Sequence, residues 1–196
     1  MHKLILASTS KARQVLLTKA GVFYSVQAPL VNEKELHREL VSFSPQQIAV
    51  ELAKAKAISV SLVHPRTVII GADQVLEFEN KPVHKVLNLT EAKRKLKRLR
   101  GKTHQLHSSF AIAKNGRIVH SEVSTATLKM RSFTDEFLVQ YIAASGKDIL
   151  SNAGCYFFEE QGIQLFDSVE GDHSTILGLP LLPLLAFLRQ SSIIAS

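Results

Sequence analysis

The chain begins with a short apolar run followed at once by helix-capping residues, and this pattern constrains the fold more than any other feature. The run Leu4–Ala7 is wholly apolar, as expected of a strand buried on both faces. Polar residues 8–10 then offer caps for a helix that we expect from about Lys11 to Ala20. Residues 23–26 are typical of the next strand. The chain is therefore predicted to start with strand, helix and strand.

Later segments continue this mixture of helices and strands. Ser44 and Pro45 mark a helix start, and residues 67–71 are rich in β-branched residues and run directly into Asp73. Two long strands, 105–113 and 117–130, flank an Asn-Gly pair that is a strong hairpin signal. Intermixed helices and strands with a hairpin predict an α/β fold with a mixed, twisted β-sheet flanked by helices.

Composition favours one compact, soluble domain over residues 1–196. The chain is 45% hydrophobic and 21% charged, which suffices for one core. Its longest apolar run, 176–188, contains a glycine and two prolines, so we expect no membrane span. The N-terminal region lacks the longer apolar centre of a secretory signal. A single cysteine, Cys155, suits a reducing compartment, and we expect a cytoplasmic protein.

The chain is basic, with a formal net charge of +7 and a pI near 9.6, which favours polyanionic partners. Much of the excess lies between Lys93 and Lys102, opposite an apolar stripe on a helix that Thr90 caps and Gly101 ends. No aromatic residues are interleaved there to stack on bases. A solvated helix face therefore explains this stretch better than a nucleic-acid site does.

Several residues have the chemistry and placement of a site. Asp73 follows a buried strand, so we place it at or near a strand end, where α/β sheets commonly hold sites; a plain turn residue is the alternative. Glu33 and Glu35 follow a strand-like segment, and either could share a divalent metal with Asp73 or be merely an exposed charge. Ser8 and Arg13 stand at a helix start that suits phosphate, although serine caps beside a surface arginine would look the same.

Seven segments in order resemble the Maf family. They are Leu4-Ile-Leu-Ala-Ser-Thr-Ser-Lys-Ala-Arg13, Leu52-Ala-Lys-Ala-Lys56-Ala, Gly71-Ala-Asp-Gln74, Leu99-Arg-Gly-Lys-Thr-His104, Ala153-Gly-Cys-Tyr156, Glu170-Gly-Asp172 and Gly178-Leu-Pro-Leu181. Together they cover nearly the whole chain. The resemblance implies a mixed α/β fold with a substrate cleft, as in Maf and inosine triphosphate pyrophosphatases. It also implies hydrolysis of a nucleoside triphosphate to the monophosphate and pyrophosphate with Mg²⁺ or Mn²⁺.

The resemblance also assigns roles, position by position. Asp73 would be the general base and a metal ligand, and Glu33 looks like the family's second metal-binding acid. The set that binds the triphosphate would be Ser8, Arg13, Lys56 and Lys85. Family members carry a lysine followed by proline after the aspartate, which would select Lys81, but the usual distance to the following Glu-Ala selects Lys85. We expect Lys85 and keep Lys81 as the alternative.

Three further residues bear on the choice of base. Family members with glutamine at the position of Gln74 are associated with 7-methylguanosine triphosphate and other substrates, and those with threonine with thymidine and uridine triphosphates. A carboxylate at Glu159 could accept hydrogen bonds from a guanine edge. Ala12 replaces an aromatic residue of the methylguanine branch, which removes stacking on a cationic base. We expect activity on 7-methyl-GTP or a broader set that includes UTP and CTP.

A rival interpretation comes from another class of protein. Maf relatives are also described as inhibitors of septum formation, so a cell-division regulator or a nucleic-acid-binding protein that acts without catalysis stays open. Such a binder should depend on the basic face between Lys93 and Lys102 and on salt concentration. A homodimer is also left open by the sequence.

Overall fold

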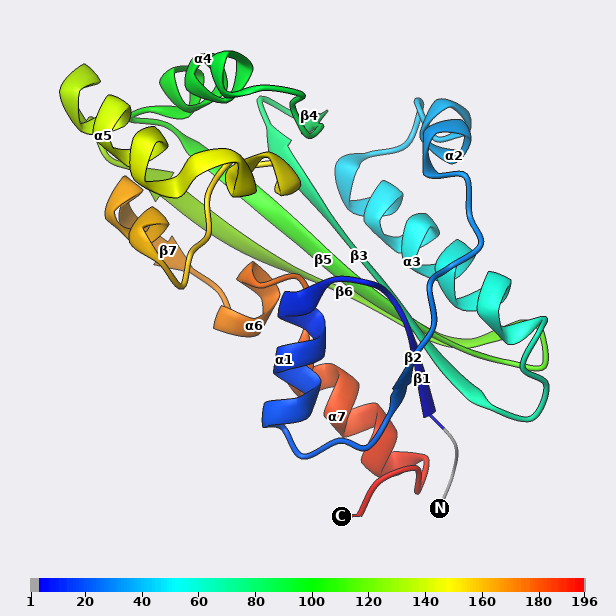
Figure 1. The fold of residues 1–196 in the computed structure, drawn as a ribbon. Coiled ribbons are helices and arrows are strands. Elements are labelled where there is room, and N and C mark those ends of the chain that lie inside the picture. Colours follow the sequence, from blue (N-terminus) through cyan, green and yellow to red (C-terminus); the bar gives the residue numbers. More distant parts are fainter. Residues whose placement is uncertain (1–3, 196) are drawn as a thin grey trace.

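The computed structural model describes residues 4–195 as a mixed α/β fold (Figure 1). Its strands are β1 (Leu4–Ala7), β2 (Ser25–Val26), β3 (Val68–Phe78), β4 (Lys81–Val83), β5 (Thr103–Lys114), β6 (Arg117–Met130) and β7 (Phe166–Glu170). Its α-helices are α1 (Lys11–Lys19), α2 (Glu33–Glu39), α3 (Pro45–Ser61), α4 (Leu89–Leu99), α5 (Asp135–Ser145), α6 (His173–Ile176) and α7 (Leu181–Gln190). Two 3₁₀ helices, η1 (Gly146–Ser151) and η2 (Gln161–Leu165), follow α5.

The strands form one mixed sheet in the order β2-β1-β3-β5-β6-β7, and β4 pairs with β3 outside this path. Strand β1 is parallel to both β2 and β3, whereas β3, β5, β6 and β7 pair antiparallel in turn. The sheet is mixed because the first strands are joined through helices while β5 and β6 form a hairpin. The predicted α/β fold is thus confirmed.

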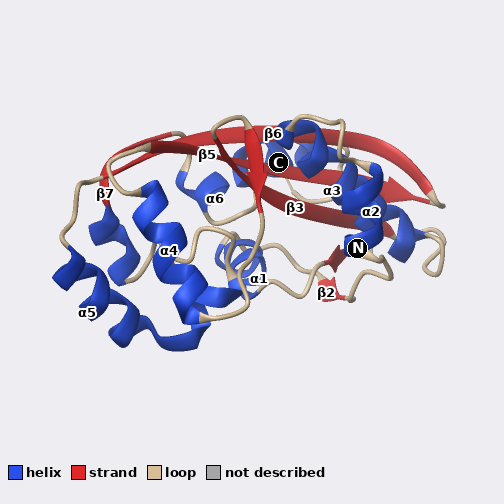
Figure 2. Ribbon diagram, turned by 90° about the horizontal axis from the view of Figure 1, so that it is seen from above, coloured by secondary structure: helices blue, strands red, loops and turns tan. Residues whose placement is uncertain are grey.

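Helices cover the two faces of the sheet in different ways. On one face α3 packs on Ile5, Ile69 and Ala111. On the other face α1 and α7 pack on neighbouring residues of β1, β3 and β5, and α4 and α5 pack on the far ends of β3, β5 and β6. Figure 2 shows α1, α4 and α5 on the same side of the sheet. Because strand side chains alternate, successive residues of β3 face different helices.

The edge of β3 opposite β5 changes partner halfway along. Strand β1 pairs with residues 68–71 and β4 pairs with residues 76–78. Between them, residues 72–75 pair with no strand on that edge within residues 4–195. Asp73 lies in this gap, within β3, so its expected position at or near a strand end is wrong. The apolar run that suggested a strand end marks only the end of pairing with β1, since pairing with β5 continues to Glu77.

Helix α3 approaches β3 at Gly71 without room for a side chain between them. A Cβ atom at Gly71 would lie 2.2 Å from the carbonyl oxygen of Ala53 and 2.5 Å from the backbone nitrogen of Ala57. Both alanines are fully buried against the sheet. Small residues on both elements therefore set the distance between the helix and the strand.

Other local predictions have mixed outcomes. The start of α3 is confirmed, with Ser44 as N-cap in a capping box and proline in the first turn, and so is the β5–β6 hairpin. The strand predicted at 23–26 is shorter, and residues 27–32, between β2 and Glu33, form no strand; Glu33 is the first residue of α2. The cap predicted at Thr90 is wrong, because α4 begins one residue earlier and Asn88 caps it. Within residues 4–195, no helix has both the length and the apolarity needed to cross a membrane.

The close approach at Gly71 yields a first prediction. Replacement by alanine should force α3 away from the sheet, because the nearest atoms belong to the backbone, and we expect a loss of about 1–3 kcal/mol in the free energy of unfolding. Urea denaturation measures this loss. Gly21→Ala is the control, because a Cβ there meets no atom within 4 Å and strains only a left-handed backbone. A Gly71→Ala variant more stable than Gly21→Ala would contradict the packing described here.

Candidate active site

Two carboxylates from distant parts of the chain share one lysine. The Nζ atom of Lys56, on α3, lies 2.5 Å from Oδ1 of Asp73 and 2.8 Å from Oε1 of Glu33. Lys56 and Asp73 are buried, at 6% and 9% exposure, whereas Glu33 is exposed. Ionised groups are this deeply buried only when they are paired, so the contact holds α3, β3 and α2 together by charge as well as by packing.

The local sequence explains this convergence. Lys56 lies between Ala53 and Ala57, the residues that contact Gly71, and Asp73 lies two residues beyond Gly71 on the same face of β3. Glu33 opens α2 just after its N-cap, Asn32, whose side chain accepts a hydrogen bond from the backbone of Glu35. Glu35 itself is exposed and bonds to Asn32, away from the lysine. The structure therefore favours Glu33 over Glu35 as the second acid.

Lys85 is the next cation near this group. It is exposed in the loop between β4 and α4. Burial alone would raise the pKa of Glu33, but the hydrogen bond from Lys56, together with the charges of Lys56, Lys85 and His37, lowers it below the ordinary carboxyl value. Lys81, the alternative, is exposed on β4 and pairs with Phe78. The charge of Lys85 acts on Glu33, and this favours Lys85 over Lys81.

Arg13 is buried at 9% exposure and its guanidinium is held on two sides. Its Nε donates to the carbonyl of Gly178 at 2.7 Å, and its Nη1 donates to Ser8 Oγ at 3.2 Å and to the carbonyl of Ala72 at 3.0 Å. Burial lowers the pKa of Arg13, and the charges of Asp73 and Glu33 oppose that shift. Within residues 4–195, Nη2 has no hydrogen-bond partner. A planar guanidinium fixed in this way presents its remaining donors in one direction.

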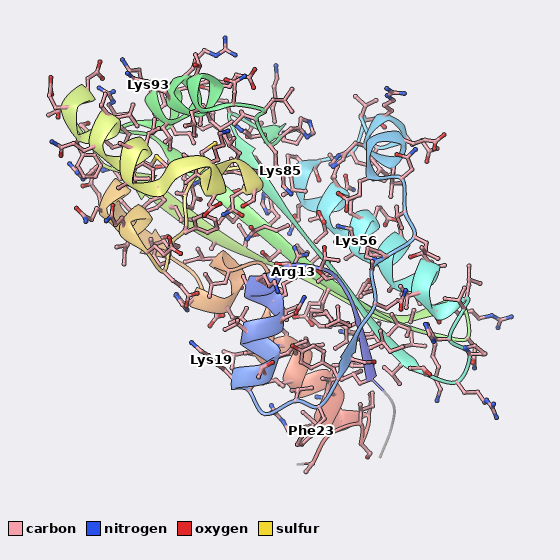
Figure 3. All side chains as sticks on the ribbon, viewed as in Figure 1. Arg13, Lys19, Phe23, Lys56, Lys85 and Lys93 are labelled. Atoms are coloured by element: carbon pink, nitrogen blue, oxygen red, sulfur yellow. The ribbon has the colours of Figure 1, made fainter. Side chains whose placement is uncertain are left out.

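Ser8 and the start of α1 stand beside Arg13. Ser10 is the N-cap residue, as expected, but its side chain makes no capping hydrogen bond; instead its backbone nitrogen donates to Ser8 Oγ at 3.3 Å. The first N–H groups of any α-helix lack partners within the helix, and the helix dipole favours an anion there. Figure 3 shows Arg13 on α1, Lys56 on α3 and Lys85 in the loop between β4 and α4.

The proposed specificity residues differ in their surroundings. Gln74 points to the face opposite Asp73, where its Nε2 lies 2.9 Å from Ser108 Oγ and 3.0 Å from the carbonyls of Thr175 and Ile176. Ala12 is half-buried in the first turn of α1, and Glu159 is exposed. Phe158, beside Glu159, contacts the ring of His173 on α6, the helix that Gln74 also contacts. All three lie on the α1 and α6 side of the sheet.

The acids suit a metal that needs few protein ligands. Among residues 4–195, no three His, Cys, Asp or Glu side chains gather into a metal-binding group. Asp73 and Glu33 instead meet around a cation, the Lys56 ammonium. Mg²⁺ in phosphate-handling sites is commonly held by one or two carboxylates, substrate phosphates and water. Two carboxylates therefore fit the protein's share of such a site, with phosphate and water as the other ligands.

The basic stretch on α4 is largely engaged within the protein. Lys97 and Arg100 pair with Asp135, and Arg98 and Lys102 pair with Glu79. Lys95 donates to the carbonyls of His84 and Ala153. In the part of the chain that the structure describes, only Lys93 and Arg94 of this stretch lack such partners. These contacts support the solvated-face interpretation over a nucleic-acid site.

A cavity of about 400 Å³ lies between β4 and α4 rather than around Asp73. Its lining includes Phe78, Val86 and Arg94 but neither the carboxylates nor Arg13. Val86 directly follows Lys85, so the cavity borders the loop that carries this lysine. The substrate cleft expected around Asp73 stays a prediction.

Sequence reasoning missed two residues that contact this group. The carbonyl of Gly178 accepts from Arg13, and Ser108 binds Gln74. Gly178 belongs to one of the segments that resemble the Maf family, so the sequence could have indicated its position. Ser108 had none, because one serine within a long strand looks like any other until the neighbouring strand is known.

Several known proteins are similar to this chain over most of its length. The family described as "Maf: Maf-like protein" matches residues 3–191. A nucleoside triphosphate pyrophosphatase from Caulobacter vibrioides is 44% identical over 94% of this chain and 93% of its own. A 7-methyl-GTP pyrophosphatase from Bartonella quintana is 42% identical over 97% of this chain and 96% of its own. The solved HAM1 protein from Coxiella burnetii is 14% identical over 68% of this chain and 75% of its own, with a TM-score of 0.41.

The family match and the first two relatives each span more than nine-tenths of the chain, and the segments that resemble Maf proteins contain Arg13, Lys56 and Asp73. The structure brings these three residues together from α1, α3 and β3. The chain belongs to the Maf-like protein family.

Proposed function

We propose that this protein hydrolyses nucleoside triphosphates to the monophosphate and pyrophosphate. The observation that carries the proposal is the Lys56 ammonium between Asp73 and Glu33, with the buried Arg13 beside them. The carboxylates can bind a metal ion and accept a proton from water, and the cations can bind phosphate oxygens. Relatives named as nucleoside triphosphate and 7-methyl-GTP pyrophosphatases, at about 40% identity over nearly the whole chain, support it.

The roles follow from chemistry and placement. Asp73 orients a water toward the α-phosphorus and accepts its proton, because it is the carboxylate beside the cations in the gap of β3. Arg13, Lys56 and Lys85 bind phosphate oxygens, so the departing pyrophosphate is held by positive charge before the bond breaks. Ser8 and the first turn of α1 contribute further donors.

Asp73 and Glu33 would hold a divalent cation, Mg²⁺ or Mn²⁺, together with the substrate phosphates. When bound, such an ion neutralises phosphate charge and lowers the pKa of a coordinated water, so that the water loses a proton more easily. Lys56 contacts both carboxylates, so it holds them near each other, and its ammonium is placed to bind a phosphate oxygen. The lone cysteine, which is buried and free, also suits the cytoplasmic location that we propose.

For the base, we propose 7-methyl-GTP or a broader set that includes UTP and CTP. The donors of the Gln74 amide are engaged by Ser108 and α6, which leaves its oxygen to accept from a base N–H. Glu159 adds an exposed acceptor near α6. Ala12 supplies no ring to stack on a methylated, cationic base, and this favours breadth over strong methylguanosine selectivity.

Replacing Asp73 by Asn tests the catalytic acid. The change nearly preserves shape but removes the proton acceptor, so we expect pyrophosphate release to fall by about 100-fold or more in a folded protein. Glu77→Gln is the matched control, since Glu77 lies on the same face of β3 but contacts His107. Near-normal turnover of folded Asp73→Asn would refute the assignment.

Replacing Glu33 by Gln tests the second metal ligand. The variant should need more Mg²⁺ or Mn²⁺ for half-maximal activity, because one anionic oxygen ligand is lost. The measurement is pyrophosphate release against metal concentration. Glu35→Gln, on the same helix but away from Lys56, should titrate like the wild type. Identical curves for Glu33→Gln and Glu35→Gln would return Glu33 to the role of a surface charge.

Lys85→Ala and Lys81→Ala form a pair that decides between two alignments. Loss of the true phosphate ligand should reduce kcat/KM by an amount equivalent to about 2–4 kcal/mol of transition-state stabilisation. We expect that loss for Lys85, whose charge acts on Glu33, and a mild effect for Lys81. If Lys81→Ala is the more damaging variant, β4 rather than the following loop supplies the ligand.

A panel of canonical and modified triphosphates tests base preference. We expect 7-methyl-GTP or a set with UTP and CTP to give the highest kcat/KM, and dTTP not to be the best substrate. Steady-state rates of pyrophosphate release for each nucleotide provide the comparison. A preference for dTTP of about tenfold or more, equivalent to about 1.4 kcal/mol, would overturn the interpretation of Gln74 and Glu159.

A further inference from the structure

Two paired residues of the central sheet hold one short turn of the chain. Gln74 and Ser108 are direct cross-strand neighbours on β3 and β5. Gln74 Nε2 lies 3.0 Å from the carbonyls of Thr175 and Ile176, and Ser108 Oγ donates to the carbonyl of Thr175 at 2.6 Å. Ser108 is fully buried. Its hydroxyl therefore acts only on protein groups and has no access to a substrate.

The turn, residues 172–178, is also stabilised by hydrogen bonds of its own. Asp172 Oδ1 accepts from the backbone nitrogens of Ser174 and Thr175, at 2.9 and 3.3 Å, and caps α6. Ser174 Oγ accepts from the backbone nitrogen of Leu181 at 2.9 Å. The backbone nitrogen of Gly178 donates to the carbonyl of Thr175 at 3.1 Å. The same carbonyl is thus bound by the sheet and by the turn that leads to Gly178.

Gly178 connects this turn to Arg13. Its φ of +99° belongs to the left-handed region, which a side chain would strain, and its carbonyl accepts from Arg13 Nε at 2.7 Å. The contact fixes one edge of the guanidinium, while Ser8 and Ala72 fix Nη1. The remaining donor, Nη2, is thereby given a defined direction.

We propose that Ser108 and Gln74 are positioning residues that set the phosphate affinity of Arg13 through the turn 172–178. The inference rests on the proposed function, in which Arg13 binds a phosphate oxygen. A long, flexible side chain loses rotational freedom when it binds a ligand, and fixing it beforehand removes that cost from binding. Gln74 then serves two purposes, with its NH₂ group toward the turn and its oxygen free for a base.

The test compares Ser108→Ala with Ser61→Ala. Ser61 is equally buried and bonds to a backbone nitrogen, that of Gly116, far from Arg13, so its loss reports the general cost of removing a buried hydroxyl. For Ser108→Ala we expect KM for the triphosphate, and the dissociation constant of inorganic pyrophosphate by calorimetry, to rise about tenfold with kcat nearly unchanged. Ser61→Ala should leave both constants near those of the wild type.

A double-mutant cycle shows whether the effect acts through Arg13. In an Arg13→Ala background, Ser108→Ala should produce no further rise in KM or in the pyrophosphate dissociation constant. Equal, additive effects with and without Arg13 would overturn the proposal, as would Ser108→Ala behaving like Ser61→Ala.

A separate measurement, pyrophosphate release by the wild-type protein, tests the proposed function. A wild-type protein that releases no pyrophosphate from any triphosphate would count against that function. Calorimetry still decides the positioning role in that case, because pyrophosphate binding needs Arg13 but no catalysis. If the wild type does not bind pyrophosphate, the positioning role is overturned as well.

Discussion

The Lys56 ammonium, held between Asp73 and Glu33, is the interaction on which the rest of the site depends. A buried lysine and a buried aspartate are each unfavourable alone, so each requires the other. Their contact is possible because Gly71 and two alanines let α3 lie directly on β3. Packing of the smallest side chains thus places the charged ones, and a larger residue at Gly71 would disturb both.

The sheet also separates two tasks along one strand. Asp73 faces α3 and the acidic and cationic groups, whereas Gln74, the next residue, faces α6 and Ser108. Arg13 joins the two sides, since it binds the carbonyl of Ala72 in β3 and the carbonyl of Gly178 beyond α6. Among the described residues, the gap between β1 and β4 leaves this mostly buried stretch of β3 without a strand partner on one edge. At this interrupted edge, the residues proposed to bind phosphate therefore lie close to Gln74, which is proposed to contact the base.

Local signals predicted much of the fold. The cap of α3, the first strand and helix, and the Asn-Gly hairpin are all confirmed, because each depends on neighbouring residues alone. Asp73 was placed wrongly, since pairing with β5 prolongs β3 past the apolar run. The site residues came mostly from motif resemblance. Their meeting at Lys56, and the role of Ser108, depend on strand order and helix packing, which residue patterns do not encode locally.

Hydrolysis of a triphosphate in ¹⁸O-labelled water tests the central claim most directly. If Asp73 directs water to the α-phosphorus, the water oxygen bonds to that phosphorus and the bridging oxygen leaves with pyrophosphate. Mass spectrometry of the products should then find the label in the nucleoside monophosphate and none in pyrophosphate. Label in pyrophosphate, or release of inorganic phosphate in its place, would contradict the account.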